Sequence, residues 1–183
     1  MLKFSNTYLI FSDAATSPQA GIAIGAFIIL TSDDLIAFSE YPYENLYARI
    51  AETIVVKQYE SKRSTWAEIT TVIAALHHIN SNSKTLDKVE IYTDCQSLCD
   101  LLGARKQKLE NNHFLTRSGK MHPNAELYKT LFVIAEKFQI TTTKIKGHDS
   151  LRETMPEKIF SVLDKLSRKT LRQTLLMANT NHK

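Results

Sequence analysis

The chain has 183 residues, of which 43% are hydrophobic and 23% are charged. It is long enough for one domain with a substantial core, and these values exclude wholesale disorder. No apolar run reaches the roughly 18 residues that a membrane-spanning helix needs, so we expect no membrane partner. The net charge of +4 gives only a modest attraction to polyanions.

Cys95 and Cys99 are the two cysteines of the chain, and a metal site would need more ligands than this pair. The N-terminus lacks the cleavage pattern of a secretory signal, so we expect a cytoplasmic protein with reduced, packed thiols. No repeat or inter-domain linker occurs. We therefore expect a single domain over residues 1–183, present as a monomer.

The N-terminal part of the chain alternates apolar runs with short turns, which is typical of an antiparallel meander. Thr7–Ser12 is a short apolar run that ends at Asp13, and Gly21–Leu30 is a second one. Thr31–Asp34 is interpreted as a turn into a third strand over Leu35–Tyr41.

The segment from Pro42 to Ser64 is compatible with two arrangements. Thr53–Tyr59 has the composition of a strand, whereas Asn45–Ala51 could form a helical turn. Either the segment is an extra hairpin arm, or the third strand of the meander is the later run and the earlier residues are inserted.

Thr65–Ile79 is the clearest helix of the sequence, because its apolar residues recur at helical spacing. Thr65 and Glu68 have the spacing of a capping box, in which the glutamate caps a backbone amide. Lys88–Leu102 begins as a strand, changes to helical spacing at Gln96 and has Gly103 as a C-terminal stop.

The last third of the chain continues the alternation of helix and strand. Asn124 is predicted to cap a helix over Ala125–Phe138. Gln139–Lys146 is predicted as a strand, and a long amphipathic helix starts at Glu157. This order of elements predicts a mixed α/β sheet. The helix over Thr65–Ile79 would serve as a crossover that makes the first and fourth strands parallel.

Acidic residues stand at the ends of two predicted strands. Asp13 and Asp94 would emerge at one edge of the sheet if their strands are parallel neighbours, and adjacent carboxylates repel unless a cation lies between them. Glu68 and Asp164 could join them from two helices. Oxygen ligands suit Mg²⁺ or Mn²⁺, and such a cluster can hold two ions for phosphoryl transfer. Alternatively, Asp94 is a helix N-cap and Glu68 only completes its capping box.

The sequence resembles the ribonuclease H family, which cuts the RNA strand of RNA:DNA hybrids. The matching stretches, in chain order, are YLIFSDAATSP with GIAIGAFIIL, STWAEITTVIAAL, VEIYTDCQSL, NAELYKTLFVIAEKFQITTTKIKGH and VLDKLSRKT. The resemblance implies a mixed five-stranded sheet, with a three-strand antiparallel meander and parallel strands, flanked by helices. The core would cover about residues 7–172, with an inserted or enlarged segment at about 42–63.

The resemblance also implies a catalytic site. Asp13, Glu68, Asp94 and Asp164 match the four metal-binding acids of the family. His148 matches a mobile-loop histidine that assists proton transfer or product release.

Further positions match those with which the family contacts nucleic acid. Ser64 and Gln96 match residues at the minor groove and 2′-hydroxyls of the hybrid, and Asn124 resembles a residue that contacts a DNA-strand phosphate. A positively charged handle for the duplex is implied for Arg105, Lys106, Lys108, Arg117 and Lys120. A second basic set, which is either a solvated face or another nucleic-acid contact, consists of Lys165, Arg168, Lys169 and Arg172.

The sequence as a whole predicts an endonuclease that uses two Mg²⁺ or Mn²⁺ ions to hydrolyse RNA in RNA:DNA hybrids, leaving 5′-phosphate and 3′-hydroxyl ends. The alternatives are a nuclease for DNA or structured RNA, and a non-cleaving module that binds nucleic acid or a protein through Pro42–Arg63. The four acids favour a nuclease, because clustered negative charge would only repel phosphates in a pure binder. Ala14 and Phe160 depart from the family pattern, which has glycine and asparagine there.

Overall fold

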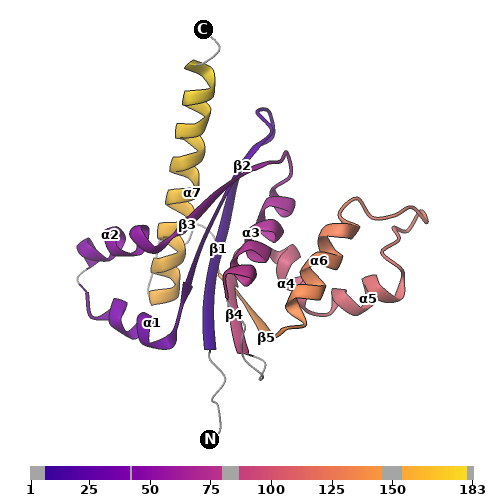
Figure 1. The fold of residues 1–183 in the computed structure, drawn as a ribbon, viewed down its shortest axis with the longest axis horizontal. Helices are drawn as coiled ribbons and strands as arrows, with labels where there is room; N and C mark the ends of the chain where they lie inside the picture. The colour runs from indigo at the N-terminus through magenta and orange to yellow at the C-terminus, as the bar shows by residue number, and fades with distance from the viewer. Residues whose placement is uncertain (1–6, 42, 80–86, 146–153, 181–183) are drawn as a thin grey trace, which may run out of the picture.

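A computed structural model describes residues 7–41, 43–79, 87–145 and 154–180 of the chain. Its centre is a five-stranded sheet with the strand order β3-β2-β1-β4-β5 (Figure 1). The strands are β1 (Thr7–Ser17), β2 (Ile22–Leu30), β3 (Val55–Glu60), β4 (Asp87–Thr93) and β5 (Phe138–Lys144). β1, β2 and β3 pair antiparallel, whereas β4 pairs parallel with both β1 and β5. The predicted mixed sheet is confirmed, including the parallel pairing of the first and fourth strands.

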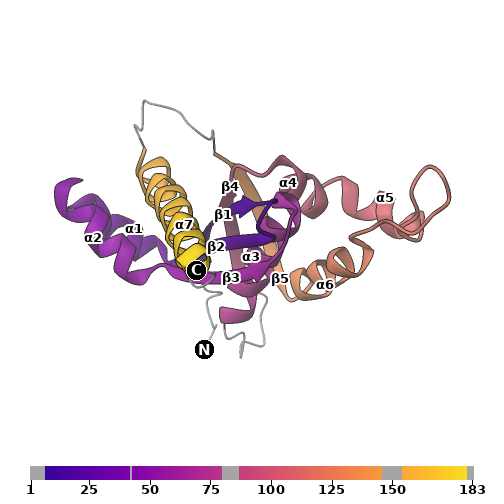
Figure 2. The ribbon, with the colours of Figure 1, turned by 90° about the horizontal axis from the view of Figure 1, so that it is seen from above.

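Helices cover both faces of the sheet (Figure 2). They are α1 (Ser32–Ser39), α2 (Tyr43–Thr53), α3 (Ser64–His78), α4 (Gln96–Leu102), α5 (Arg105–Asn111), α6 (Ala125–Ala135) and α7 (Met155–Thr180). Successive strand residues point to opposite faces, so Ile10 packs in the core beneath α3 and α6 while Phe11 packs in the core beneath α7. No helix in the described ranges is long and apolar enough to cross a membrane.

The strand predicted over Leu35–Tyr41 is wrong, because Ser32–Ser39 forms helix α1. Thr31 and Asp34, interpreted as part of a turn, instead form a capping box. The Asp34 amide donates to Thr31 Oγ1 over 3.2 Å, and the Thr31 amide donates to Asp34 Oδ2 over 2.7 Å. The third strand of the meander is therefore the later run, and α1 and α2 are inserted between β2 and β3.

The capping box that Thr65 and Glu68 could have formed, which was the alternative role of Glu68, is absent at this helix start. Helix α3 begins one residue earlier, and its N-cap Arg63 makes no side-chain capping bond. Glu68 turns away from its own helix end, and its Oε1 accepts a hydrogen bond from the Ala14 amide over 3.3 Å. The glutamate therefore links α3 to β1. At the other end of the chain, Phe138 opens β5 rather than ending a helix.

The close approach of α3 to the sheet depends on a glycine. Gly25 of β2 lies opposite Ala14 in the ladder with β1. A Cβ at Gly25 would overlap the hydroxyl group of Thr71 on α3, so a larger residue would push the helix outward. This contact holds α3 near enough for Glu68, one turn before Thr71, to reach the backbone of β1.

Candidate active site

Three carboxylates meet where β4 ends and β1 continues. The parallel ladder ends with Phe11 opposite Tyr92, and the same register carried two residues further brings Asp13 beside Asp94. Glu68 approaches from α3. Each of the three offers an oxygen, and these atoms all lie within 4.8 Å of one another. We call this group, Asp13, Glu68 and Asp94, the carboxylate cluster.

The cluster is buried deeply enough to change its protonation. Asp13 is 5% exposed and Glu68 is 7% exposed, whereas Asp94 is half-buried. Burial, with smaller contributions from the charges of Asp164 and Asp94, raises the pKa of Asp13 to about 6. Burial and the charges of Asp13 and Asp94 raise the pKa of Glu68 well above its usual range. A cation would compensate these charges and displace the protons.

The donor atoms fit a hard divalent cation. Glu68 Oε2 is buried and has no hydrogen-bonding partner among the described residues, a state that costs free energy unless a cation or water satisfies the oxygen. The thiol of the neighbouring Cys95 is not among the clustered donor atoms, and burial raises its pKa to about 11. An all-oxygen set of this kind suits Mg²⁺ or Mn²⁺ rather than zinc.

Helix α7 supports the cluster from the other face of the sheet. Ser167 is fully buried, and its Oγ donates a 2.5 Å hydrogen bond to Asp13 Oδ2, which opposes the rise in the Asp13 pKa. Asp164 lies near enough to raise that pKa, but it is not one of the carboxylates within 4.8 Å of one another. Its Oδ1 instead accepts from Arg168 Nε over 2.6 Å. His148 lies outside the described residues.

The residues expected to contact nucleic acid flank the cluster. Ser64 is exposed and lies one helical turn before Glu68. Gln96 begins α4, and its side chain lies between Asp100 and Lys144, with hydrogen bonds of 2.8 and 2.9 Å. Asn124 Oδ1 accepts a 3.2 Å bond from Arg63, the residue before Ser64, although Asn124 makes no side-chain capping bond to α6.

Sequence reasoning missed three residues at this site. Ser167 had a detectable signal, because it is a polar residue on the apolar side of a predicted helix. Arg63 and Lys144 had none, because each is identified only by a partner 61 or 48 residues away along the chain.

The basic stretch that was predicted as a handle lies on α5 and the loop after it. Lys108, Arg117 and Lys120 are exposed. Lys106 is different, because its Nζ lies 3.0 Å from a carboxylate oxygen of Glu136, 3.9 Å from one of Glu110 and 5.4 Å from the ring centre of Phe132. The charge of Lys106 is thus largely compensated within the protein.

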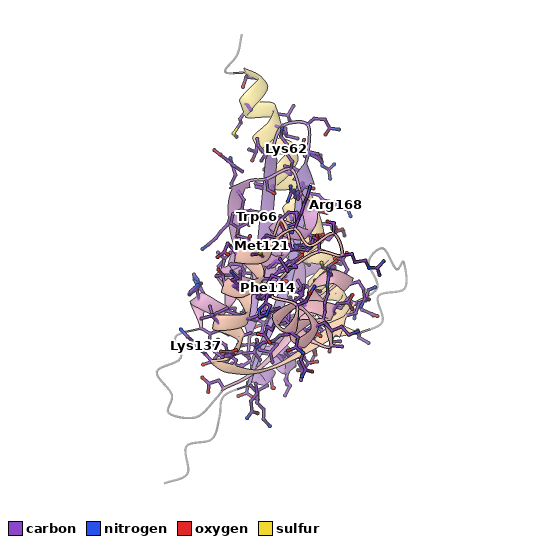
Figure 3. All side chains as sticks on the ribbon, turned by 90° about the vertical axis from the view of Figure 1, so that its right-hand side faces the viewer. Lys62, Trp66, Phe114, Met121, Lys137 and Arg168 are labelled. Carbon is purple, nitrogen blue, oxygen red and sulfur yellow. The ribbon has the colours of Figure 1, made fainter. Side chains whose placement is uncertain are left out.

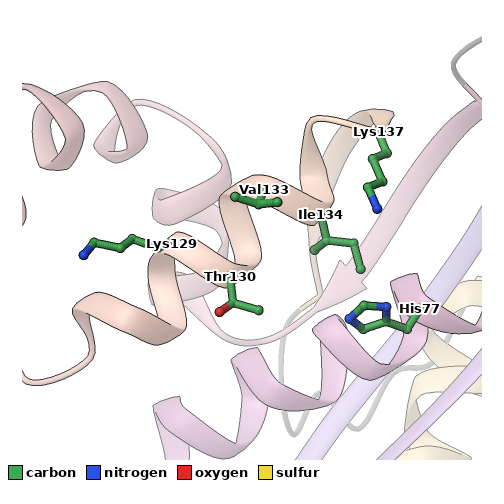
Figure 4. A pocket seen from close by; sticks show the side chains of 6 residues that line it. All are labelled: His77, Lys129, Thr130, Val133, Ile134 and Lys137. Atoms are coloured by element: carbon green, nitrogen blue, oxygen red, sulfur yellow. The ribbon is translucent and has the colours of Figure 1, made fainter.

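A separate pocket of about 300 Å³ opens between the end of α3 and α6 (Figure 4). It is lined by His77, Lys129, Thr130, Val133, Ile134 and Lys137. None of the candidate catalytic acids contributes to it, so this pocket is not the site described above.

The chain matches the family model described as RNase H over residues 5–159. No curated protein sequence matches it. Among solved structures, it is similar to LC9-RNase H1, described as a type 1 RNase H with the type 2 active-site motif. That match has 12% identity and a TM-score of 0.65 and covers 92% of this chain and 74% of the other.

Two further structures cover the domain almost completely. The N-terminal RNase H domain of Rv2228c from Mycobacterium tuberculosis has 14% identity and a TM-score of 0.62, with 95% of this chain and 99% of that chain covered. LC11-RNase H1 in complex with RNA/DNA hybrid has 13% identity and a TM-score of 0.54, with 90% and 99% covered. At such identities, these structures establish the fold.

Proposed function

The chain belongs to the ribonuclease H family, and on that premise we propose that it is a metal-dependent endonuclease for the RNA strand of RNA:DNA hybrids. The observation that carries the proposal is the carboxylate cluster, with a buried Glu68 oxygen that has no partner in the described part of the chain. A cluster of this kind is costly to a protein unless cations bind there.

We propose that Asp13, Glu68 and Asp94 hold two Mg²⁺ or Mn²⁺ ions, with Asp164 as the fourth acid. Such ions, when bound, activate water for attack on phosphorus and stabilise the departing oxygen. Breakage of the bond between phosphorus and the 3′-oxygen leaves a 5′-phosphate and a 3′-hydroxyl group, and His148 is proposed to help the proton transfer or product release. Ser167 fixes the orientation of Asp13 through its hydrogen bond.

The RNA strand would be recognised by groups beside the cluster. A 2′-hydroxyl both donates and accepts hydrogen bonds, and it distinguishes RNA from DNA at a given site. Ser64 and Gln96, both exposed, are the proposed contacts in the minor groove, and Asn124 with Arg63 is the proposed contact for a DNA phosphate. The complex of LC11-RNase H1 with RNA/DNA hybrid supports this choice of substrate.

A cleavage assay tests the proposal. A hybrid with labelled RNA is incubated with Mg²⁺, with Mn²⁺ or with EDTA, beside duplex DNA and duplex RNA of the same sequence. We expect shortened RNA with 5′-phosphate ends from the hybrid alone, and no products in EDTA. Hybrid binding that is indifferent to EDTA, without products in either metal, would favour a non-cleaving module instead.

A further inference from the structure

The positive charge of the chain is concentrated after its last acid. Residues 1–164 hold 18 lysines and arginines and 19 acids, whereas residues 165–183 hold five and none. The whole net charge of +4 therefore comes from the segment that begins on α7, directly after Asp164. The proposed catalytic roles leave this charge unexplained.

Three of these residues form one surface of α7, which we call the α7 basic face: Lys165, Lys169 and Arg172. Their spacing of four and three residues places them on one side of the helix, and all three are exposed. The buried side of the same segment carries Ser167 and Leu171. No ion pair found within the described ranges involves the α7 basic face. Arg172 donates its Nε to the Arg168 carbonyl over 3.3 Å, and its two amino groups have no hydrogen-bonding partner among the described residues.

The α7 basic face lies at the same end of the molecule as the carboxylate cluster. Helix α7 continues past the sheet at the end where β1 turns into β2 (Figure 1), and Lys62 and Arg168 lie toward that end (Figure 3). Because a helix rises 1.5 Å per residue, Arg172 lies roughly 12 Å beyond Asp164 along the axis. With phosphates about 3.4 Å apart along a strand, this is a distance of roughly three to four nucleotides.

The neighbours of α7 restrict where a polyanion can approach. The arm formed by α1 and α2 packs beside α7, on the side away from α5 (Figure 2). Its described residues include three acids, Asp33, Asp34 and Glu52, but only one basic residue, Arg49. The arm therefore carries net negative charge and repels phosphates. On the far side of the cluster, the handle has lost part of its charge to the ion pairs of Lys106.

We propose that the α7 basic face binds the sugar–phosphate backbone of the nucleic acid that is cut at the carboxylate cluster, three to four nucleotides from the cleaved bond and on the opposite side from α5. The proposal rests on the proposed function for the identity of the substrate. It makes α7 a second backbone-binding surface, which extends the bound duplex beyond the handle.

Binding in EDTA tests the proposal without cleavage. The variant Lys169→Ala/Arg172→Ala is compared with wild type and with Lys57→Ala/Lys88→Ala, which removes two exposed charges on β3 and at the amino end of β4. We expect hybrid affinity to fall by roughly tenfold at low salt in the α7 variant only, and the slope of log K against log salt to lose about two units. The variant Lys169→Arg/Arg172→Lys, which keeps both positive charges, should have the affinity and the salt slope of wild type. Equal affinities and slopes for the two alanine pairs would overturn the proposal.

A shortened substrate locates the contact. When the cleavable ribonucleotides lie within about three base pairs of one end of the duplex, the phosphates that α7 would contact are missing. Two such duplexes are compared, one with the ribonucleotides near each end. For one of them, wild type and the α7 variant should bind with equal affinity. A persistent difference at both ends would contradict the proposal. A wild-type protein that binds hybrid through α7 but never cuts it would refute the nuclease function, and only the backbone-binding role of the α7 basic face would stand.

Discussion

The carboxylate cluster and the α7 basic face are adjacent, yet they are built in opposite ways. The cluster gathers acids from three distant segments, buries two of them and raises the pKa of both, Asp13 and Glu68. The α7 basic face takes its charges from one helix and leaves them in water, where they are screened and cost little. Buried charges of one sign are tolerated where they serve a metal site, whereas exposed charges can contribute to the affinity for nucleic acid. The two regions should therefore respond differently to mutation, pH and salt.

The largest expected effect comes from neutralising the cluster. Asp13→Asn or Asp94→Asn should lower the cleavage rate by more than about 100-fold, because even groups that only hydrogen-bond to a metal ligand contribute about 10–100-fold. Hybrid binding in EDTA should be unchanged or slightly tighter, since a negative charge that faces phosphates is removed. Single-turnover cleavage and filter binding measure the two effects. A variant that cuts at the wild-type rate would show that the site is assigned to the wrong residues.

The next effect concerns the support that α7 gives to the cluster. Ser167→Ala removes the donor to Asp13 Oδ2, so the pKa of Asp13 should rise further and the affinity for Mg²⁺ should fall by about 10–100-fold. Titration of activity against Mg²⁺ should show a higher half-saturation concentration, with partial recovery at high Mg²⁺. Thr170→Ala, one turn away on α7, is the matched control. A change in overall stability without a change in metal dependence would assign Ser167 a purely structural role.

The pH dependence should reveal the cost of the buried charge. Because the pKa of Asp13 is raised from 3.8 to about 6, the folded protein binds more protons than the unfolded chain between these values. Without metal, stability should therefore fall as the pH rises through this window, by on the order of 2–3 kcal/mol from Asp13.

Thermal unfolding of wild type and Asp13→Asn in EDTA, from pH 4.5 to pH 8, isolates this contribution. The variant should be the more stable protein at pH 8, and the advantage should shrink toward pH 4.5. Stabilisation of wild type by added Mg²⁺ should grow as the pH rises. If the difference in melting temperature between the two proteins is the same at every pH, the pKa of Asp13 is not raised in the folded protein.

The smallest effect separates two lysines of the handle. Lys106→Ala should change hybrid affinity less than Lys108→Ala, because Lys106 is engaged with Glu136 and Glu110 whereas Lys108 is exposed. The expected loss in the salt slope is about one unit for Lys108 and less for Lys106. The reverse order would mean that nucleic acid displaces the ion pairs of Lys106.

The sequence predicted the elements that have a strong periodic pattern. The apolar stripe of α3 and the change from strand to helix at Gln96 were both recognisable, and with them the parallel pair that brings Asp13 near Asp94. The stretch around α1 failed because a capping box and a turn use the same residue types, so Thr31 and Asp34 were compatible with both.

Other features depend on tertiary contacts that local sequence does not encode. Glu68 matched a helix cap in sequence, but packing at Gly25 brings its side chain to the backbone of Ala14 instead. The pairing of Ser167 with Asp13 joins residues 154 positions apart. Such contacts follow from how α3 and α7 lie on the sheet, which only the assembled fold determines.

The connection between β2 and β3 holds residues 31–54, yet the two strands stay in register from Phe27 opposite Val55 to Ile22 opposite Glu60. The entropy cost of closing a loop grows only with the logarithm of its length, so this connection can lengthen at little cost. The number of residues between Asp13 and Glu68 can therefore differ among homologues while the distance between the two side chains stays the same. A search pattern with a set interval between these two acids would overlook chains of this kind, whereas one anchored on the ladder between β1 and β4 would find them.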